Sequence, residues 1–387
     1  MSIINDSQAL ADFCGRISHN SYITVDTEFM RENTFWPQLC VVQLGGEDEA
    51  QAIDALAEGL DLAPLMALMG DEKILKVFHA ARQDLEIFFH LNGSLPAPLF
   101  DTQVAAMVCG FGDSAGYETL ARKLAGASVD KSSRFTDWAR RPLTDKQIDY
   151  ALSDVTHLRV VYEKLDGMLG QNGRREWLDE EIAILTSHET YDQPAENAWK
   201  RLKSRSPAPR FLAILREVAA WRDREAKGRD LPRNRVLRDE ALLEIAHHAP
   251  ADVEQLGRTR GLGKKMAEGR AGEALLAAVA AGQAVPEDEC PMLPKKPQLP
   301  RGIGPITDLL KVVLKMKCEQ NNVAQKLIAT TDQLEVIAAF GADADVPALR
   351  GWRRQIFGDD ALQLMRGDLA LVANGQELEL VEFAEEE

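Results

Sequence analysis

Two acidic residues stand two positions apart at the end of a short apolar run. Asp26 and Glu28 follow the run 23–25, with one threonine between them. Side chains of a strand alternate between its two faces, so residues two apart point the same way. Paired acids in apolar surroundings are costly unless a positive charge lies between them, and a divalent metal ion would supply that charge. A bare pair of this kind can equally end a strand at the surface, so the interpretation depends on whether other acids join it.

Two further acids stand where they could reach the same place. The run 75–78 predicts a second strand, and Asp84 lies one turn into the helix predicted to follow it. Later in the chain, Tyr150 and Asp154 are four residues apart, which places them on one face of a predicted helix. Mg²⁺ and Mn²⁺ prefer carboxylate oxygens, whereas Zn²⁺ favours His and Cys. The four carboxylates therefore make a candidate site for hard divalent ions.

The segments that carry these residues belong to a region of mixed strand and helix patterns. Short β-rich or apolar runs come first, and helical patterns follow. Strands followed by helices that pack on them are typical of a mixed α/β sheet domain. The predicted strands are 22–25, 39–44, 50–53 and 75–78, and the predicted helices are 82–91, 102–109, 117–124 and 145–169.

Proline-rich stretches divide the rest of the chain into two helical blocks. Residues 192–209 contain three prolines, and residues 285–305 contain six. Such a composition is typical of linkers, and the second linker should be extended and fairly stiff. The tail should form a hairpin, because its residues alternate around Asn374-Gly375, a strong turn signal. We therefore expect three domains, over residues 1–192, 207–285 and 303–387.

The length and composition are those of a globular protein with more than one domain. The chain has 387 residues, of which 45% are hydrophobic and 27% are charged. No apolar run of about eighteen residues occurs and the N-terminus lacks a signal-peptide pattern, so no membrane association is expected. The five cysteines are scattered and form no C-x-x-C pair. This usage indicates free thiols in a reducing cytosol, and hence a cytoplasmic protein.

The net charge of −16 argues at first against a nucleic-acid partner, because Lys and Arg normally drive phosphate binding. Residues 1–190, however, contain 30 acidic and 16 basic residues, a net of −14, whereas residues 201–240 contain 6 acidic and 12 basic residues, a net of +6. An acidic metal site beside a basic surface that grips the nucleic-acid backbone would give this pattern. The charge therefore permits such a partner without identifying it.

The acids lie in three short motifs, which follow one another along the chain as Asp26-Thr27-Glu28, His79-x-x-Arg82-x-Asp84-Leu85 and Tyr150-x-x-x-Asp154. These motifs, in this order, resemble those of the DEDD exonucleases. The tyrosine four positions before the last aspartate resembles the tyrosine subclass, since the histidine subclass would have a histidine at position 149, which is an aspartate here. The flanking segments 26–43, 130–142 and 150–158 narrow the resemblance to the ribonuclease D family.

The resemblance implies a ribonuclease H-like α/β exonuclease domain and a two-metal mechanism. Asp26 would bridge two Mg²⁺ or Mn²⁺ ions, Glu28 and Asp154 would complete the ion on the nucleophile side, and Asp84 would hold the ion on the leaving-group side. Tyr150 would orient the attacking water without binding metal. The implied reaction removes nucleoside 5′-monophosphates from the 3′ ends of structured RNA such as tRNA precursors.

Six other residues are candidates for substrate binding. Phe35 could stack on the terminal base, although it could equally be a core aromatic residue. His79 could approach the terminal nucleotide, and a buried, hydrogen-bonded histidine is an equally good interpretation. The remaining candidates for contacts to the base, ribose or phosphates are Met30, Thr34, Lys131 and Arg134.

The helical blocks resemble the C-terminal domains of helicases and ribonuclease D, abbreviated HRDC. Residues 221–226 and 230–233 resemble the first such domain, and residues 351–358 resemble the end of a second one more loosely. The resemblance then covers nearly the whole chain, for which we expect a monomer. Two alternatives stay open at this point: a DNA-directed 3′–5′ exonuclease, and a nucleic-acid-binding scaffold with an inactive nuclease domain.

Overall fold

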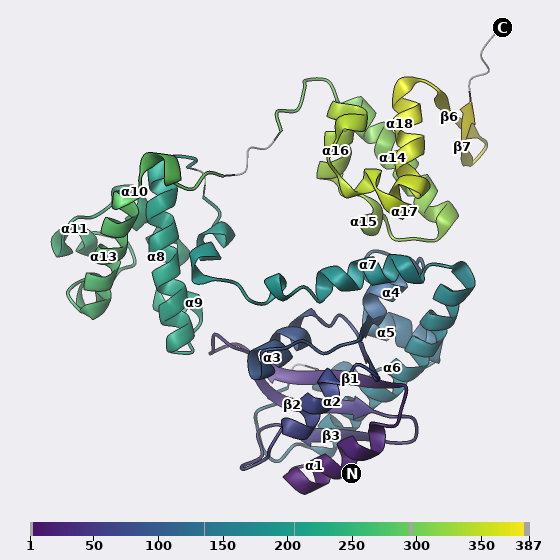
Figure 1. Cartoon of the computed structure of the whole chain (residues 1–387), viewed down its shortest axis with the longest axis horizontal. Coiled ribbons are helices and arrows are strands. Elements are labelled where there is room, and N and C mark those ends of the chain that lie inside the picture. The colour runs from purple at the N-terminus through teal and green to yellow at the C-terminus, as the bar shows by residue number, and fades with distance from the viewer. Residues whose placement is uncertain (1–2, 135, 205, 294–296, 383–387) are drawn as a thin grey trace.

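The computed structural model describes residues 3–134, 136–204, 206–293 and 297–382. Along the chain, an N-terminal domain built on a sheet is followed by two helical units (Figure 1). The resemblance implies that this first domain is the nuclease domain, and it is called by that name below. The two units lie apart from each other, and each lies beside the nuclease domain. The fold is thus an α/β domain followed by two mainly helical units, the second of which ends in a hairpin, as the sequence predicts.

A mixed five-stranded sheet forms the centre of the nuclease domain, in the order β3-β2-β1-β4-β5. The first three strands are antiparallel neighbours, while β4 and β5 run parallel to β1. The predicted strands are confirmed, but β1 is longer than predicted and the three-residue β5 was not predicted. The strands are β1 (Tyr22–Met30), β2 (Gln38–Gly45), β3 (Ala50–Asp54), β4 (Leu75–Phe78) and β5 (Leu99–Asp101).

Seven α-helices accompany this sheet in the described part of the nuclease domain. The longest, α6 (Asp145–Asn172), starts with a capping box in which Thr144 and Gln147 satisfy each other's backbone amides. It packs across β1, β2 and β3. The other helices are α1 (Ser7–Ile17), α2 (Ala63–Gly70), α3 (Arg82–Asn92), α4 (Thr102–Val108), α5 (Tyr117–Leu120) and α7 (Arg175–Leu185).

The first helical unit has a hydrophobic core of its own. The core includes Leu212, Leu215 and Leu242, all fully buried. Trp199 and Leu202 also pack there, because the stretch Ala195–Arg201 forms a 3₁₀ turn against α8 within the segment predicted as a linker. The helices are α8 (Pro209–Gly228), α9 (Arg233–Val236), α10 (Asp239–His248), α11 (Val253–Gly257), α12 (Lys264–Ala267) and α13 (Arg270–Ala284).

The last helical unit shares its core with the nuclease domain. Trp352 stacks on Trp177 of α7, with ring centroids 4.2 Å apart, and Leu310 and Leu314 join the same cluster as Met107 of α4. The unit consists of α14 (Gly304–Asn321), α15 (Gln325–Ile328), α16 (Thr331–Phe340), α17 (Gly351–Arg353), α18 (Asp359–Arg366) and the predicted hairpin, β6 (Leu369–Asn374) and β7 (Glu377–Glu382). Among the described residues, no helix has both the length and the apolar character needed to cross a bilayer.

Candidate active site

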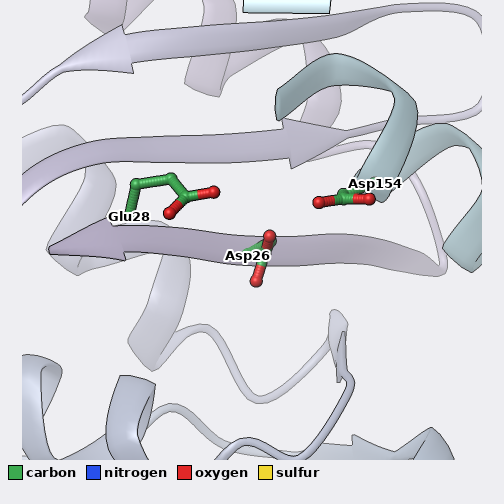
Figure 2. A group of neighbouring side chains, drawn as sticks. All are labelled: Asp26, Glu28 and Asp154. Atoms are coloured by element: carbon green, nitrogen blue, oxygen red, sulfur yellow. The ribbon is translucent and has the colours of Figure 1, made fainter. Parts of the chain in front are cut away.

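Three carboxylates from β1 and α6 meet at one place. Asp26, Glu28 and Asp154 each present a potential ligand atom, and these atoms all lie within 4.8 Å of one another. Figure 2 shows the two strand residues side by side and Asp154 pointing at them from its helix. Asp26 and Glu28 share the face of β1 covered by α6, where the Thr24 hydroxyl donates a hydrogen bond to the Val155 carbonyl at 2.8 Å. That contact fixes the helix beside the strand and brings Asp154 to the pair.

The fourth carboxylate, Asp84, reaches the site from the first turn of α3. The hydroxyl of Thr27, between the two strand acids, donates a hydrogen bond to it. The turn before α3 contains Ala80 at a φ of 57° and is stabilised by Asp101, whose carboxylate accepts hydrogen bonds from the amides of Ala80 and Ala81 at 3.0 and 2.8 Å. The structure therefore brings together all four acids that the sequence singled out.

Burial and mutual repulsion make these acids hard to ionise without a cation. Burial, together with the charge of Asp154, raises the pKa of Asp26 to about 8. Burial and the three neighbouring acids raise the pKa of Glu28 to about 10. Burial raises the pKa of Asp154 to about 7, and burial and Asp26 raise that of Asp84 well above its ordinary range. Shifts of this kind, in a cleft, are typical of functional sites.

This donor set fits hard divalent cations. All four groups are oxygen donors, and Oδ1 of Asp154 is buried with no hydrogen-bond partner among the described residues. A buried, unpartnered carboxylate oxygen is costly, and a cation would satisfy it. Carboxylates are also the ligands that Mg²⁺ and Mn²⁺ prefer.

Two tyrosines frame Asp154. The side chain of Tyr150 hydrogen-bonds to the Asp154 carboxylate and lowers its pKa. Burial and the nearby acids raise the pKa of Tyr150 above its ordinary range, so its hydroxyl keeps its proton at neutral pH. The hydroxyl of Tyr117, on α5, donates a hydrogen bond to the backbone carbonyl of Asp154 at 2.5 Å. Tyr150 can therefore donate a hydrogen bond into the site, while Tyr117 holds the helix that carries Asp154.

The acids line a pocket of about 680 Å³, within the range of ligand-binding cavities. Arg134 also lines it, and its positive charge lowers the pKa of both Glu28 and Asp154. His79 lines the pocket as well, with Nδ1 lying 3.0 Å from the Thr102 hydroxyl. Burial lowers the pKa of His79, which favours its neutral form. Arg134 and His79 are thus placed to face a substrate in this pocket.

Three other predicted substrate-binding residues lie outside this pocket, toward the first helical unit or in the core. Met30 packs with Cys40 and Trp138. The hydroxyl of Thr34 donates a hydrogen bond to the Trp36 carbonyl at 2.6 Å. Phe35 is 7% exposed and packs against Ala226 and Val236, which belong to the first helical unit. The side chain of the fourth, Lys131, falls outside the part of the structure that is described.

Residues that complete the site were not singled out from the sequence. Thr27 lies inside the Asp26-Thr27-Glu28 motif, where its hydroxyl could have been recognised as a possible hydrogen-bond donor to a nearby carboxylate. Tyr117 and Asp101 carry no local signal, because the sequence does not show which helix they approach. The same holds for Asp230, whose carboxylate accepts hydrogen bonds from the amides of Phe35 and Trp36 at 3.0 and 3.1 Å.

The chain is similar to known proteins over nearly its whole length. A family model for the 3′–5′ exonuclease domain matches residues 1–170, and one for the HRDC domain matches residues 211–279. The ribonuclease D of Granulibacter bethesdensis is 49% identical over 381 residues, which cover 98% of this chain and 96% of that protein. The ribonuclease D of Jannaschia sp. is 50% identical over 383 residues, covering 98% and 99%.

The same likeness holds in three dimensions. The crystal structure of Escherichia coli RNase D, an exoribonuclease involved in structured RNA processing, matches with a TM-score of 0.80 at 30% identity, covering 95% of this chain and 98% of that chain. The chain therefore belongs to the ribonuclease D family of metal-dependent 3′–5′ exoribonucleases.

Proposed function

We propose that Asp26, Glu28, Asp84 and Asp154 hold two divalent ions, Mg²⁺ or Mn²⁺, and that the chain uses them to shorten RNA from its 3′ end. The observation that carries the proposal is the meeting of three carboxylates within 4.8 Å, with Asp84 hydrogen-bonded to the same strand. Divalent ions bound there would activate a water molecule and neutralise the charge that develops on the phosphate.

Each acid has a distinct place in this scheme. Asp26 would be the ligand shared by the two ions, because it raises the pKa of both Glu28 and Asp84 and its own pKa is raised by Asp154. The charge of Asp26 thus acts on ligands of both proposed ions, Glu28 for one and Asp84 for the other. Glu28 and Asp154 would complete the ligands of the ion on the nucleophile side, and Asp84 would hold the ion on the leaving-group side.

Tyr150 orients the attacking water. Its hydroxyl retains its proton and faces the Asp154 carboxylate, so it can hold a water molecule at the correct angle without taking a place among the ligands. Arg134 binds the phosphate, since its charge already acts on Glu28 and Asp154. His79, which belongs to the same motif as Asp84, contacts the terminal nucleotide. Met30, Thr34, Phe35 and Lys131 remain predicted substrate contacts.

The substrates we propose are structured RNAs with 3′ extensions, such as tRNA precursors, and the products are nucleoside 5′-monophosphates. The likeness to the E. coli enzyme supports this substrate class. The first helical unit supports it as well, because residues 201–240 have a net charge of +6 beside the acidic nuclease domain. Basic side domains can hold the RNA backbone while the 3′ end advances.

The direct test is degradation of a 3′-extended tRNA, labelled within the extension, in Mg²⁺, in Mn²⁺ and in EDTA. We expect stepwise loss of 3′ nucleotides as 5′-monophosphates with either metal and none in EDTA. A DNA strand of the same sequence is the matched control. Faster degradation of the DNA would identify the chain as a DNA-directed 3′–5′ exonuclease with the same chemistry. Degradation in EDTA would show that cleavage does not need the proposed metal ions.

We also propose that the chain acts as a monomer in the cytoplasm. All five cysteines are free and buried, which suits a reducing compartment. Light scattering at micromolar concentration should therefore give one mass of about 43 kDa, the mass of the single chain.

A further inference from the structure

A basic groove lies between the nuclease domain and the first helical unit. Five of its lining residues are cationic and one is acidic. Arg31 and Arg82 come from the nuclease domain, Arg201 from the 3₁₀ turn before α8, and Lys227 and Arg233 from the helical unit. The acid is Glu86 of α3. We refer to these six residues as the interdomain groove.

Only part of this positive charge is neutralised by the protein itself. Glu86 forms a two-pronged ion pair with Arg31, at 2.7 and 2.8 Å. Asp223, whose side chain is 3% exposed, pairs with Arg233 at 2.6 Å and with Lys227 at 3.2 Å. Five cations and these two anions leave a net charge of +3. Because the buried Asp223 carboxylate holds both Lys227 and Arg233, the positions of these two cations are fixed before any ligand binds.

The side chains of the two remaining arginines form no ion pair with an acid among the described residues. Arg201 donates a hydrogen bond to the neutral amide of Gln193 at 2.7 Å, and Arg82 forms no hydrogen bond or ion pair with the described residues. Partial burial and the like charges of Arg233 and Arg31 lower the pKa of Arg201, and the charges of Asp223 and Glu86 offset this only in part. A guanidinium held beside two others is unfavourable in the empty protein, and an anion would relieve the repulsion.

The groove and the active-site pocket are lined by neighbouring residues of the same two chain segments. Arg82 lines the groove, while Asp84, two residues later on α3, lines the active-site pocket. Likewise, Phe29 of β1 lines the pocket and Arg31, just beyond the strand, lines the groove. The groove therefore begins beside the carboxylates, on two segments that also line the pocket.

The wall of the groove is fixed by contacts between the two domains. The Asp230 carboxylate binds the amides of Phe35 and Trp36, and the Phe35 ring lies 4.3 Å from the Arg233 guanidinium carbon. Trp36 in turn stacks on His90, with centroids 4.0 Å apart. Because the Phe35 ring is held in place, it fixes the position of the two cations that lie over it, Arg233 and Lys227.

We propose that the interdomain groove binds the phosphodiester backbone of the RNA strand on the 5′ side of the scissile phosphate, with Arg82 and Arg201 as its principal contacts. The inference rests on the proposed function, which places the 3′ end at the carboxylates. A strand entering from the groove carries one negative charge per nucleotide, which complements a group of cations that keeps a net charge of +3 after its internal ion pairs. Such contacts position the strand and carry no sequence preference.

The experiment compares the Arg82→Gln/Arg201→Gln double variant of the full chain with the wild type. Binding of fluorescent single-stranded RNA is measured by anisotropy in EDTA, so that the readout does not depend on catalysis, with oligonucleotides from a trinucleotide to about 12 nucleotides over a salt series. Arg354→Gln/Arg366→Gln is the matched control. It removes the same charge from exposed arginines paired with Asp359 and Asp368, in a unit (303–387) with 8 basic and 15 acidic residues, a net of −7.

We expect the groove variant to bind the longest RNA about tenfold or more weakly, and its log–log salt slope to be smaller by about 1.4, since each lost phosphate contact on a single strand contributes about 0.7. The defect should shrink as the RNA is shortened, and the control should match the wild type. Melting temperatures verify that both variants are folded.

Three results would overturn the proposal. An unchanged affinity and slope would make the groove an internal ion-pair network. An equal loss for every RNA length would place the two arginines at the terminal nucleotide. Weaker binding of a nucleoside 5′-monophosphate, with unchanged affinity for long RNA, would make the groove a product site. If the wild-type chain bound RNA but showed no metal-dependent cleavage, the proposed function would be contradicted, while the assignment of the groove would stand.

Discussion

Thr27 donates its hydroxyl hydrogen bond to the Asp84 carboxylate, which joins the strand carrying Asp26 and Glu28 to the helix carrying the fourth acid. This bond lowers the pKa of Asp84 against the effects of burial and of Asp26, which raise it. The hydroxyl therefore keeps Asp84 easier to ionise, and ionised carboxylates are the form that binds cations.

Thr27→Val, which removes only the hydroxyl, should consequently raise the pKa of Asp84. The acid limb of the pH–rate profile should move to higher pH, and more Mg²⁺ should be needed for half-maximal activity. Thr186→Val is the control, because the Thr186 hydroxyl donates to the Ile182 backbone carbonyl at the end of α7, a helix that does not line the active-site pocket. An acid limb that stays in place in Thr27→Val would show that the bond is only structural.

Tyr150→Phe should slow the chemical step by about 10²–10⁴-fold, the usual contribution of a positioned proton-handling group. Metal affinity should change little, since the tyrosine is not a ligand in the proposed scheme. Single-turnover rates and Mg²⁺ titrations separate the two effects. Tyr162→Phe, farther along α6, is the matched control, and a normal rate in Tyr150→Phe would reduce Tyr150 to a packing residue.

The metal-free protein should become less stable as pH rises from about 5 to 8. The pKa of Asp154 is raised to about 7 and that of Asp26 to about 8, whereas both are near 4 in an unfolded chain. Between these values the native state binds more protons than the unfolded state, so the free energy of unfolding falls with increasing pH.

Thermal melts in EDTA across this pH range test the linkage. Adding Mg²⁺ should restore the melting temperature most strongly at the alkaline end, because metal binding competes with protons for the same oxygens. Asp154→Asn should flatten the pH dependence in EDTA by removing one of the titrating groups. A melting temperature that climbs steadily to pH 8 in EDTA would argue against four mutually repelling acids.

The last helical unit should be needed for the stability of the nuclease domain. Trp352 is 6% exposed and stacks on Trp177, and Arg353 pairs with Glu180 at 2.7 Å. Trp352→Ala should lower the free energy of unfolding by about 3 kcal/mol, as is typical for a buried aromatic residue. Val372→Ala, in the exposed part of the hairpin, should change it little. A denaturant titration with no difference between the two variants would mean that the unit is only loosely attached.

The sequence was informative wherever a local pattern determines local structure. The alternation around Asp26 and Glu28 predicts a shared face, and the spacing of Tyr150 and Asp154 predicts a shared helical face; both are what the structure shows. The extension of β1 through Met30 was not predictable from its polar end, because pairing with β2 stabilises that part of the strand.

Contacts between distant segments could not be predicted from one sequence. Asp230 is separated by 195 residues from Phe35, which it binds, and nothing near either residue indicates the other. The same is true of the shared core between α7 and the last helical unit. Phe35 illustrates the consequence, since a base-stacking role and a core role were equally compatible with the sequence, whereas the fold packs the ring against the first helical unit.

The most direct test of the carboxylate site is Asp154→Asn assayed on 3′-extended RNA in Mg²⁺, with RNA binding measured in EDTA alongside. Asp149→Asn, an exposed acid on the same helix, is the matched control. The proposed mechanism predicts that Asp154→Asn releases no detectable nucleoside 5′-monophosphate while it folds and binds RNA like the wild type, and that Asp149→Asn is fully active. Turnover by Asp154→Asn at the rate of Asp149→Asn would contradict it.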